Sequence, residues 1–249
     1  MADALPTGAS VLDELHAKFG VRGLERIEQA LTIYDSGEVP PLPDKQYSQA
    51  LYVPGLTAKP WHEAKDFAWW TPFEDATPEV LRELAIVEKA DVGYTDWAGY
   101  GQGWTGRAFY QQGAWQEETC ALAPVTTALL RSTRYTQGDF LYSVIKGGGF
   151  IGHHSGQCNA ILSTHLALII PPGCLIEVGG VQREWQVGKC LAFDDSFAHA
   201  VWNTSSQRRV CLVWEVWHPE LTDLECAAMA IAYQKLVNDL PDEDEADEG

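Results

Sequence analysis

The second half of the chain is built from short apolar runs that are separated by turn residues. From about residue 140 onward the runs are rich in Val, Ile, Leu and aromatic residues, and Gly-Gly-Gly, Pro-Pro-Gly, Gly-Gly and Asn-Thr-Ser-Ser segments interrupt them. Runs of this kind are typical of β-strands that end in tight turns. Their regular spacing predicts a β-sandwich or jelly roll. We expect strands over residues 140–146, 159–170, 174–180, 189–193, 199–203 and 208–217.

Three other segments have the spacing of helices. Residues 9–34 repeat apolar residues at intervals of three and four until a Pro-rich stretch ends the pattern. Residues 77–90 open with Thr77 as the expected cap and Pro78 in the first turn. Residues 223–240 predict a closing helix. The apolar positions of the first segment are Leu12, Leu15, Phe19, Leu24, Ile27 and Leu31.

These elements predict a mainly β fold with flanking helices, of the α+β class. We expect an N-terminal helical segment, residues 1–45, packed on the core. The β domain would span residues 46–222, followed by a C-terminal helix over residues 223–240. The last residues, 241–249, read PDEDEADEG and predict a disordered acidic tail.

Composition narrows the classes of partner. The 249 residues include 17 basic and 35 acidic side chains, a net charge of −18. Phosphate binding needs a surplus of Lys and Arg, so we expect no nucleic-acid partner and no adhesion to an anionic membrane. No apolar run is long enough to predict an integral membrane segment. The ten Trp and nine Tyr exceed what a core requires, and Trp97, Trp104 and Tyr110 are candidates to line a cleft.

The cysteines indicate the compartment. Six cysteines are scattered along the chain without a Cys-x-x-Cys pair. In a chain of this size the pattern favours reduced, buried thiols rather than a disulfide framework or a zinc site. The first residues contain neither a basic nor an apolar segment of a signal peptide. The sequence therefore predicts a cytoplasmic protein.

Three residues have a spacing that suggests a metal site. His199 lies in the apolar stretch FDDSFAHAVWN, where a histidine is most often an ordinary core residue. However, His154 precedes it by 45 residues and Arg209 follows it by ten. Jelly-roll iron oxygenases use two imidazoles and usually one carboxylate on one face of Fe(II), with an arginine for 2-oxoglutarate. The spacing fits, but Gly156 stands where the carboxylate would be.

Five blocks of sequence together resemble the aspartyl/asparaginyl β-hydroxylase family, over residues 50 to 221. The resemblance implies a double-stranded β-helix, a cupin-like jelly roll. It also implies an enzyme that uses Fe(II), 2-oxoglutarate and O₂, releases succinate and CO₂, and hydroxylates an unactivated carbon. This family lacks the carboxylate ligand and has a glycine in its place, as Gly156 is here. The blocks are LYVPGLTAKPWH, YQQGAWQEETCALAPVTTALL, HHSGQCNAILSTHLALIIPPGC, VGKCLAFDDSFAHAVWN and WHPEL.

The resemblance assigns roles to individual positions. His154 and His199 match the two metal ligands of the catalytic site. Ser143, His165 and Arg209 match the residues that bind 2-oxoglutarate.

Their neighbours have other expected roles. His153 has no counterpart in the family; we expect it to form a wall of the site, although a ligand swap with the adjacent histidine stays open. For Asp194 and Asp195 we expect turn capping, or support of the ligands, rather than metal binding.

The substrate position departs from the family. Members that act on acidic side chains have arginines two and four residues before the histidine that matches His165, and Ser163 and Ile161 stand there in this chain. We therefore expect a neutral or cationic substrate, which could be a small molecule, a peptide or a lipid acyl group. The family's disulfide near Cys120 is also excluded, because Thr127 replaces its second cysteine.

Two other functions remain open from the sequence. A halogenase, or another enzyme with a different outcome at the metal, could use the space left by the missing carboxylate for chloride. A catalytically silent binding module could keep the same fold. The sequence indicates neither the substrate nor the oligomeric state.

Overall fold

The computed structural model describes residues 5–48, 50–90, 94–96, 98–111 and 113–238. Its centre is a barrel of antiparallel strands in the order β1-β9-β6-β11-β5-β10-β7-β8. The predicted strands are all present, and β8 is added to them. Their bounds are β5 Phe140–His154, β6 Ile161–Ile169, β7 Cys174–Val178, β8 Val181–Arg183, β9 Cys190–Asp194, β10 His199–Asn203 and β11 Arg209–Trp217.

Strand β5 is long enough to pair with strands on two sides of the barrel. Its first part pairs with β11, where Ser143 lies opposite Cys211. Its last part pairs with β10, where His154 lies opposite His199. The Gly-Gly-Gly segment, which we expected to end this strand, instead lies within it, and Gly148 has a positive φ of 74° that suits glycine.

The strand therefore joins two four-stranded layers. One layer has the order β5-β11-β6-β9 and the other the order β5-β10-β7-β8. The predicted jelly roll, a double-stranded β-helix, is confirmed.

Four shorter or less regular strands extend the barrel. β1 (Trp61–His62) pairs with β9. β2 (Thr95–Asp96) and β4 (Ala114–Trp115) pair with β3 (Gly101–Gln111), which adds to β5. The sequence did not predict β3, because three glycines interrupt its alternation of apolar and polar residues.

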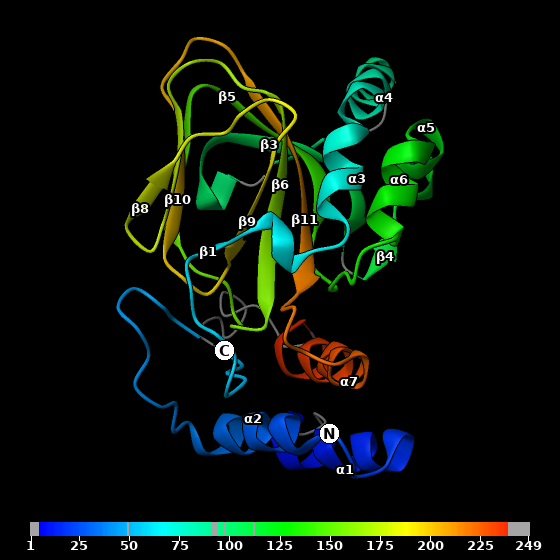
Figure 1. Ribbon diagram of the computed structural model, residues 1–249, viewed down its shortest axis with the longest axis vertical. Coiled ribbons are helices and arrows are strands. Elements are labelled where there is room, and N and C mark those ends of the chain that lie inside the picture. Colours follow the sequence, from blue (N-terminus) through cyan, green and yellow to red (C-terminus); the bar gives the residue numbers. More distant parts are fainter. Residues whose placement is uncertain (1–4, 49, 91–93, 97, 112, 239–249) are drawn as a thin grey trace, which may run out of the picture.

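Four helices cover the outer face of the β6–β11 layer (Figure 1). They are α3 (Trp70–Asp75), α4 (Thr77–Lys89), α5 (Glu117–Leu122) and α6 (Pro124–Arg131). Their apolar side chains pack against Leu166, Leu212 and Trp214, which point outward from the sheet. The predicted cap at Thr77 is wrong by one residue: Ala76 is the N-cap, and the Thr77 hydroxyl donates to the Glu74 carbonyl. Short 3₁₀ helices occupy Ala64–Asp66 and Ala98–Tyr100.

The N-terminal segment forms two helices rather than one. α1 (Gly8–Phe19) and α2 (Glu25–Ser36) are separated by Gly20 and Gly23, which both have positive φ. The apolar spacing continued across this break, so the pattern alone did not predict it.

The same end of the barrel is covered by the C-terminal helix. α7 (Asp223–Tyr233) continues as a π-helical turn, Gln234–Asn238. Side chains of α1, α2 and α7 share one apolar cluster with Leu51, Ile161 and Trp217, and the three helices lie beneath the barrel in Figure 1. The acidic tail, 241–249, lies outside the described residues.

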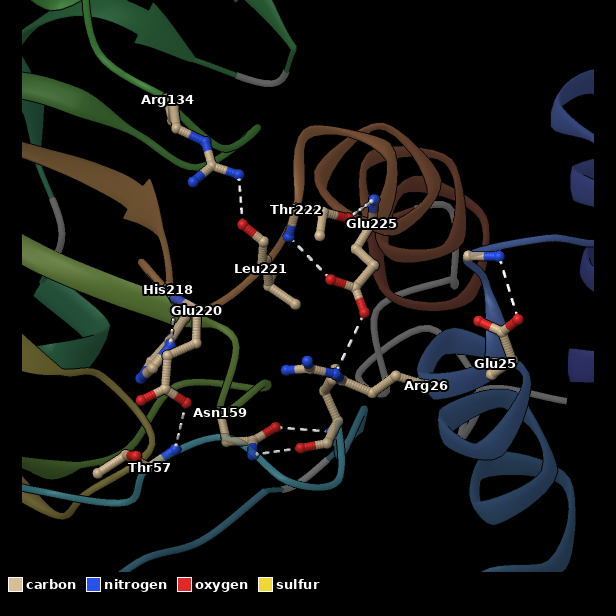
Figure 2. Close-up of polar contacts among 12 residues, drawn as sticks. Glu25, Arg26, Thr57, Arg134, Asn159, His218, Glu220, Leu221, Thr222 and Glu225 are labelled. Carbon is tan, nitrogen blue, oxygen red and sulfur yellow. Dashed lines mark hydrogen bonds and ion pairs between the residues drawn. The ribbon is translucent and has the colours of Figure 1, made fainter.

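Polar contacts fix the start of α7 (Figure 2). Thr222 and Glu225 form a capping box, and Arg26 of α2 forms an ion pair with Glu225 at 3.1 Å. Arg134 donates to the carbonyl of Leu221 at 2.7 Å. The C-terminal helix is thus tied both to the N-terminal helices and to the segment that leads into β5.

All six cysteines lie among the described residues, and each is buried with a free thiol. None of the helices in the described part of the chain is both long and apolar enough to cross a bilayer.

Candidate active site

A cavity of about 720 Å³ lies inside the barrel. Alternate residues of a strand point to the same face, and the inward-facing residues of β5, β6, β10 and β11 form its walls. Residues of the turn that follows α7 also line it. The predicted residues Ser143, His154, His165, His199 and Arg209 all line this one cavity.

His154 and His199 lie side by side at one wall. Their ring centroids are 4.1 Å apart. Each Nδ1 lies 2.8 Å from a backbone carbonyl, that of Gly152 for His154 and that of Phe197 for His199. A carbonyl can only accept, so each Nδ1 carries the proton and each Nε2 keeps a lone pair.

Both imidazoles are held in the neutral form. Burial lowers the pKa of His199 to about 4. Burial and then the neighbouring His199 lower the pKa of His154. Neutral imidazoles with free Nε2 lone pairs are the form of histidine that binds a metal ion.

Asp195 also points into the cavity. We did not expect this from its position four residues before His199 in the sequence. Its Oδ1 lies 3.6 Å from His199 Nε2, and burial raises its pKa to about 6. The approach depends on Gly156, since a Cβ at that position would lie 1.8 Å from Asp195 Oδ2. Asp194 has the expected turn-capping role: its Oδ1 accepts from the backbone N–H and the hydroxyl of Ser196.

Arg209 is buried deep in the cavity without a counter-ion. Its side chain is 1% exposed, and no carboxylate of the described residues pairs with it. Nη1 donates to Ser143 Oγ at 3.1 Å, and Nε has no hydrogen-bond partner. The Ser143 oxygen also accepts from Trp104 Nε1 at 3.0 Å, so its own O–H is left to donate into the cavity. A buried, unpaired guanidinium is costly, and an anionic ligand would remove that cost.

His165 and Arg209 are held in place by Trp185. The indole N–H donates to His165 Nδ1 at 3.3 Å, and the guanidinium lies 4.4 Å from the indole centroid. Burial and the charge of Arg209 keep the pKa of His165 well below its usual value. Because Nδ1 accepts, Nε2 carries the hydrogen. Sequence reasoning missed Trp185, which lies in the loop between β8 and β9, without a recognisable motif.

The opposite end of the cavity has a different character. Ile161 and Ser163 line it on the same face of β6 as His165, as expected for residues four and two positions earlier on the strand. Asp139 and Glu215 also line it, and neither was predicted. Burial, and then the charges of Asp195 and Asp139, raise the pKa of Glu215 to about 8.

Four aromatic or histidine residues were expected to line the cavity, and Trp104 is the one among them that the structure shows there. His153 does not form a wall: successive strand residues face opposite sides, and its exposed ring lies 3.4 Å from Glu177. Tyr110 packs in the outer core against Trp115 and Phe140. Trp104 lines the cavity, and Trp97 lies outside the described residues.

The donor set fits the cofactors that the sequence led us to expect. Two neutral imidazole nitrogens suit Fe(II), and the buried Arg209 with the Ser143 hydroxyl suits a carboxylate. Among the described residues, no three His, Cys, Asp or Glu side chains are arranged to hold a metal ion. His154 and His199 are the two side chains here that would hold a metal ion.

Comparisons with known proteins find one family among the relatives of this chain. The family profile of aspartyl/asparaginyl β-hydroxylase matches residues 74–219. The aspartyl/asparaginyl β-hydroxylase of Mus musculus is 35% identical over 204 residues, which cover 71% of this chain and 26% of that protein. The Homo sapiens protein of the same name is 34% identical over 204 residues, covering 71% and 25%. The chain thus spans about a quarter of the length of these two relatives.

Among solved structures, an oxidoreductase of the 2OG-Fe(II) oxygenase family from Burkholderia pseudomallei aligns with a TM-score of 0.42 and 11% identity. The alignment covers 68% of this chain and 98% of that one. The family profile covers more than half of the chain and includes every residue proposed here to bind metal or cosubstrate. The chain belongs to the aspartyl/asparaginyl β-hydroxylase family.

Proposed function

We propose that this chain is a 2-oxoglutarate-dependent Fe(II) hydroxylase. The observation that carries the proposal is the pairing, in one cavity, of two adjacent imidazoles that keep free Nε2 lone pairs with a buried arginine that has no counter-ion among the described residues. The overall reaction adds one oxygen atom of O₂ to a substrate C–H bond. The other oxygen atom enters succinate, and CO₂ is released from 2-oxoglutarate. Bound Fe(II) would supply the activation of O₂.

The residues of the chain would position the reactants. His154 and His199 would hold the metal through Nε2, and the Nδ1 bonds to backbone carbonyls fix both rings. Arg209, the Ser143 hydroxyl and His165 Nε2–H would bind the distal carboxylate of 2-oxoglutarate, with Trp185 keeping two of these groups in place. Phe193 and Val201 line the cavity, and their apolar side chains would keep water away from the wall that holds the histidines.

The position of Asp195 favours hydroxylation over halogenation. A halogenase needs an open site beside the metal for chloride. Here the carboxylate of Asp195 takes the space next to Gly156, and its negative charge would repel a halide.

Substitution of the histidines tests the proposal. We expect His154→Ala and His199→Ala each to abolish Fe(II)-dependent succinate formation and to weaken binding of Mn(II), followed by electron paramagnetic resonance. His153→Ala is the matched control, because that ring faces away from the cavity, and it should retain both properties. Loss of activity in His153→Ala with full activity in His154→Ala would move the ligand by one residue. Metal binding without any 2-oxoglutarate turnover in the unmodified chain would support a silent binding module.

Substitution of the arginine tests the cosubstrate site. Arg209→Lys keeps the charge but loses the two-pronged hydrogen bonding of the guanidinium. We expect the Kd for 2-oxoglutarate to rise about tenfold, the equivalent of about 1.4 kcal/mol, while the Kd for Mn(II) stays unchanged. An unchanged Kd for 2-oxoglutarate would remove Arg209 from the site.

A further inference from the structure

The two ends of the cavity carry different ionisable groups, a guanidinium at one end and carboxyl groups at the other. Arg209 is the only Lys or Arg that lines it within the described part of the chain. At the other end lie the carboxyl groups of Asp139 and Glu215, and Asp195 connects this end to the metal-binding histidines. If Arg209 binds 2-oxoglutarate, the acidic end is left for the substrate.

Strand geometry separates the two ends. Arg209 and Glu215 lie six residues apart on the same face of β11, which places their Cα atoms about 20 Å apart at roughly 3.3 Å per residue. No ion pair joins them. The acidic end therefore has no cation of its own among the described residues that line it.

Glu215 is built into the wall. Its Oε2 accepts from Thr136 Oγ1 at 2.9 Å, and Gly138 leaves the room that this carboxyl group occupies. Across the β6–β11 ladder, Glu215 lies opposite Ser163, one of the two positions where arginine would be expected for an acidic substrate. Because serine stands at this position instead of arginine, the carboxyl group of Glu215 faces a neutral residue.

Two further groups indicate a ligand in this cavity. Gln137, two residues before Asp139 in the sequence, also lines the cavity, and its buried Oε1 has no hydrogen-bond donor. Arg209 Nε, at the other end, is a buried donor without an acceptor. Unsatisfied buried polar atoms are uncommon. An N–H donor would satisfy the acceptor at one end, and an anion would satisfy the donor at the other.

We propose that the substrate carries a protonated primary amine on an aliphatic chain, and that Glu215, Asp139 and Gln137 hold this ammonium group while a nearby carbon is hydroxylated. The assignment rests on the proposed oxygenase function. Three N–H donors of an ammonium match three acceptors. A positive charge would also relieve the mutual repulsion of the carboxyl groups, which contributes to the raised pKa of Glu215. A carboxylate substrate would add to that repulsion.

Three probes that differ only at the end of the side chain test this assignment. They are the Nα-acetyl amides of lysine, norleucine and 2-aminoadipate, which end in an ammonium, a methyl and a carboxylate group. Binding is measured by calorimetry, without oxygen, on protein loaded with Fe(II) and 2-oxoglutarate. We expect the lysine probe to bind at least tenfold more tightly than the other two. With oxygen admitted, it should gain the mass of one oxygen atom. Free lysine in parallel distinguishes a small-molecule substrate from a residue within a peptide.

Two variants test the residues. Glu215→Gln keeps an acceptor for Thr136 but removes the carboxyl group that could ionise against a bound ammonium, and should weaken binding of the lysine probe about tenfold. Ser163→Arg should reverse the preference in favour of the 2-aminoadipate probe. Glu38→Gln, the same substitution at an exposed position after α2, is the control and should leave all three affinities unchanged.

The outcomes separate the two proposals. Equal affinity for the lysine and norleucine probes, tighter binding of 2-aminoadipate, or no binding of any probe would overturn the ammonium assignment. If 2-oxoglutarate still binds and is turned over in the presence of Fe(II), the oxygenase function stands in each of these cases. Absence of Fe(II)- and 2-oxoglutarate-dependent turnover would overturn both proposals.

Discussion

At the scale of single residues, Gly156 and Asp195 share one small space beside His154 and His199, the proposed metal ligands. The backbone N–H of Gly156 donates to the Asp195 carbonyl at 2.7 Å, and the Asp195 carboxylate occupies the place of a side chain at position 156. A chain with a carboxylate at position 156 would have no room for one at position 195. Gly156 therefore does more than replace a carboxylate ligand. It is also needed to leave room for the Asp195 side chain.

We predict that Gly156→Asp and Asp195→Gly are coupled. The first change alone forces two carboxylates into one space, and we expect it to lower the free energy of unfolding by about 2 kcal/mol or more. Adding Asp195→Gly should restore most of this loss, because it removes the clash. Chemical denaturation of the four proteins gives the coupling energy. Additive effects would show that the two side chains do not compete.

His62 is a second buried residue whose environment has a measurable consequence. Its ring is 1% exposed, both ring nitrogens lack hydrogen-bond partners, and it lies 5.3 Å from the ring of His218. Burial lowers its pKa to about 3. In the unfolded chain the pKa is about 6.5, so below that pH the unfolded state binds a proton that the folded state does not.

We predict that His62 reduces stability as the pH falls from about 6.5 toward 3. At pH 5 the loss should be about 2 kcal/mol, from about 1.5 pH units at about 1.4 kcal/mol each. His62→Phe should remove this component, so the gap in unfolding free energy between variant and wild type should widen as the pH falls from 7 to 5. Parallel stability profiles for the two proteins would contradict the prediction.

Residue spacing and the family resemblance pointed to groups that lie on strands, but not to those that depend on turns. His154, His199 and Arg209 lie on β5, β10 and β11, where a fixed alternation decides which side chains face inward. Asp195 follows β9 in a turn whose shape depends on contacts with β5. Glu215 faces inward on a strand that was predicted. Its proposed role in substrate binding depends on its neighbours Asp139 and Ser163, which the position of Glu215 in the sequence does not reveal.

At the scale of elements, the end of the cavity depends on helices that are distant in sequence. Tyr233, Gln234 and Val237 line the cavity from the end of α7. α7 rests on α1 and α2 through a shared apolar cluster and the ion pair between Arg26 and Glu225. The N-terminal helices thus support the element that lines the proposed substrate end.

We predict that a cavity in the N-terminal cluster loosens α7. Leu15 of α1 is fully buried, and Leu15→Ala should lower the unfolding free energy by about 2–5 kcal/mol. Amide hydrogen exchange should become faster in α7 than in the barrel strands, because α7 loses part of its support. Leu5→Ala, at a side chain that is 61% exposed, is the control and should change stability by less than about 0.5 kcal/mol. Unchanged exchange in α7 would show that this helix is held by the barrel alone.

The elements differ in how well their pattern predicted them. Strands β6, β7, β9, β10 and β11 are buried apolar runs bounded by turn residues, so their type and approximate bounds followed from the sequence. β3 is held in the sheet by pairing along β5, a long-range contact that offsets the weak strand preference of its glycines. In the break between α1 and α2, by contrast, the local conformation prevails. Gly20 and Gly23 adopt positive φ angles and end the helix although the apolar pattern continues.

At the scale of the whole molecule, the net charge of −18 bears on which substrates approach. A strongly negative protein attracts cations and repels anions over distances of the order of the Debye length, which is about 10 Å at 0.1 M salt. The same sign of charge lines the proposed substrate end of the cavity. Long-range attraction and local binding would therefore favour the same ammonium-bearing substrate.

We predict that salt slows association of the lysine probe and speeds that of the 2-aminoadipate probe. Between about 20 and about 300 mM NaCl, screening should lower the association rate of the lysine probe about three- to tenfold, measured by stopped-flow tryptophan fluorescence. The norleucine probe is the control, and its rate should stay nearly constant. Deleting residues 241–249, which contain acidic but no basic side chains, should reduce the salt dependence of the lysine probe. A rate for the lysine probe that is independent of salt would mean that the charge of the whole chain does not guide the substrate, and that selection for an ammonium group takes place inside the cavity alone.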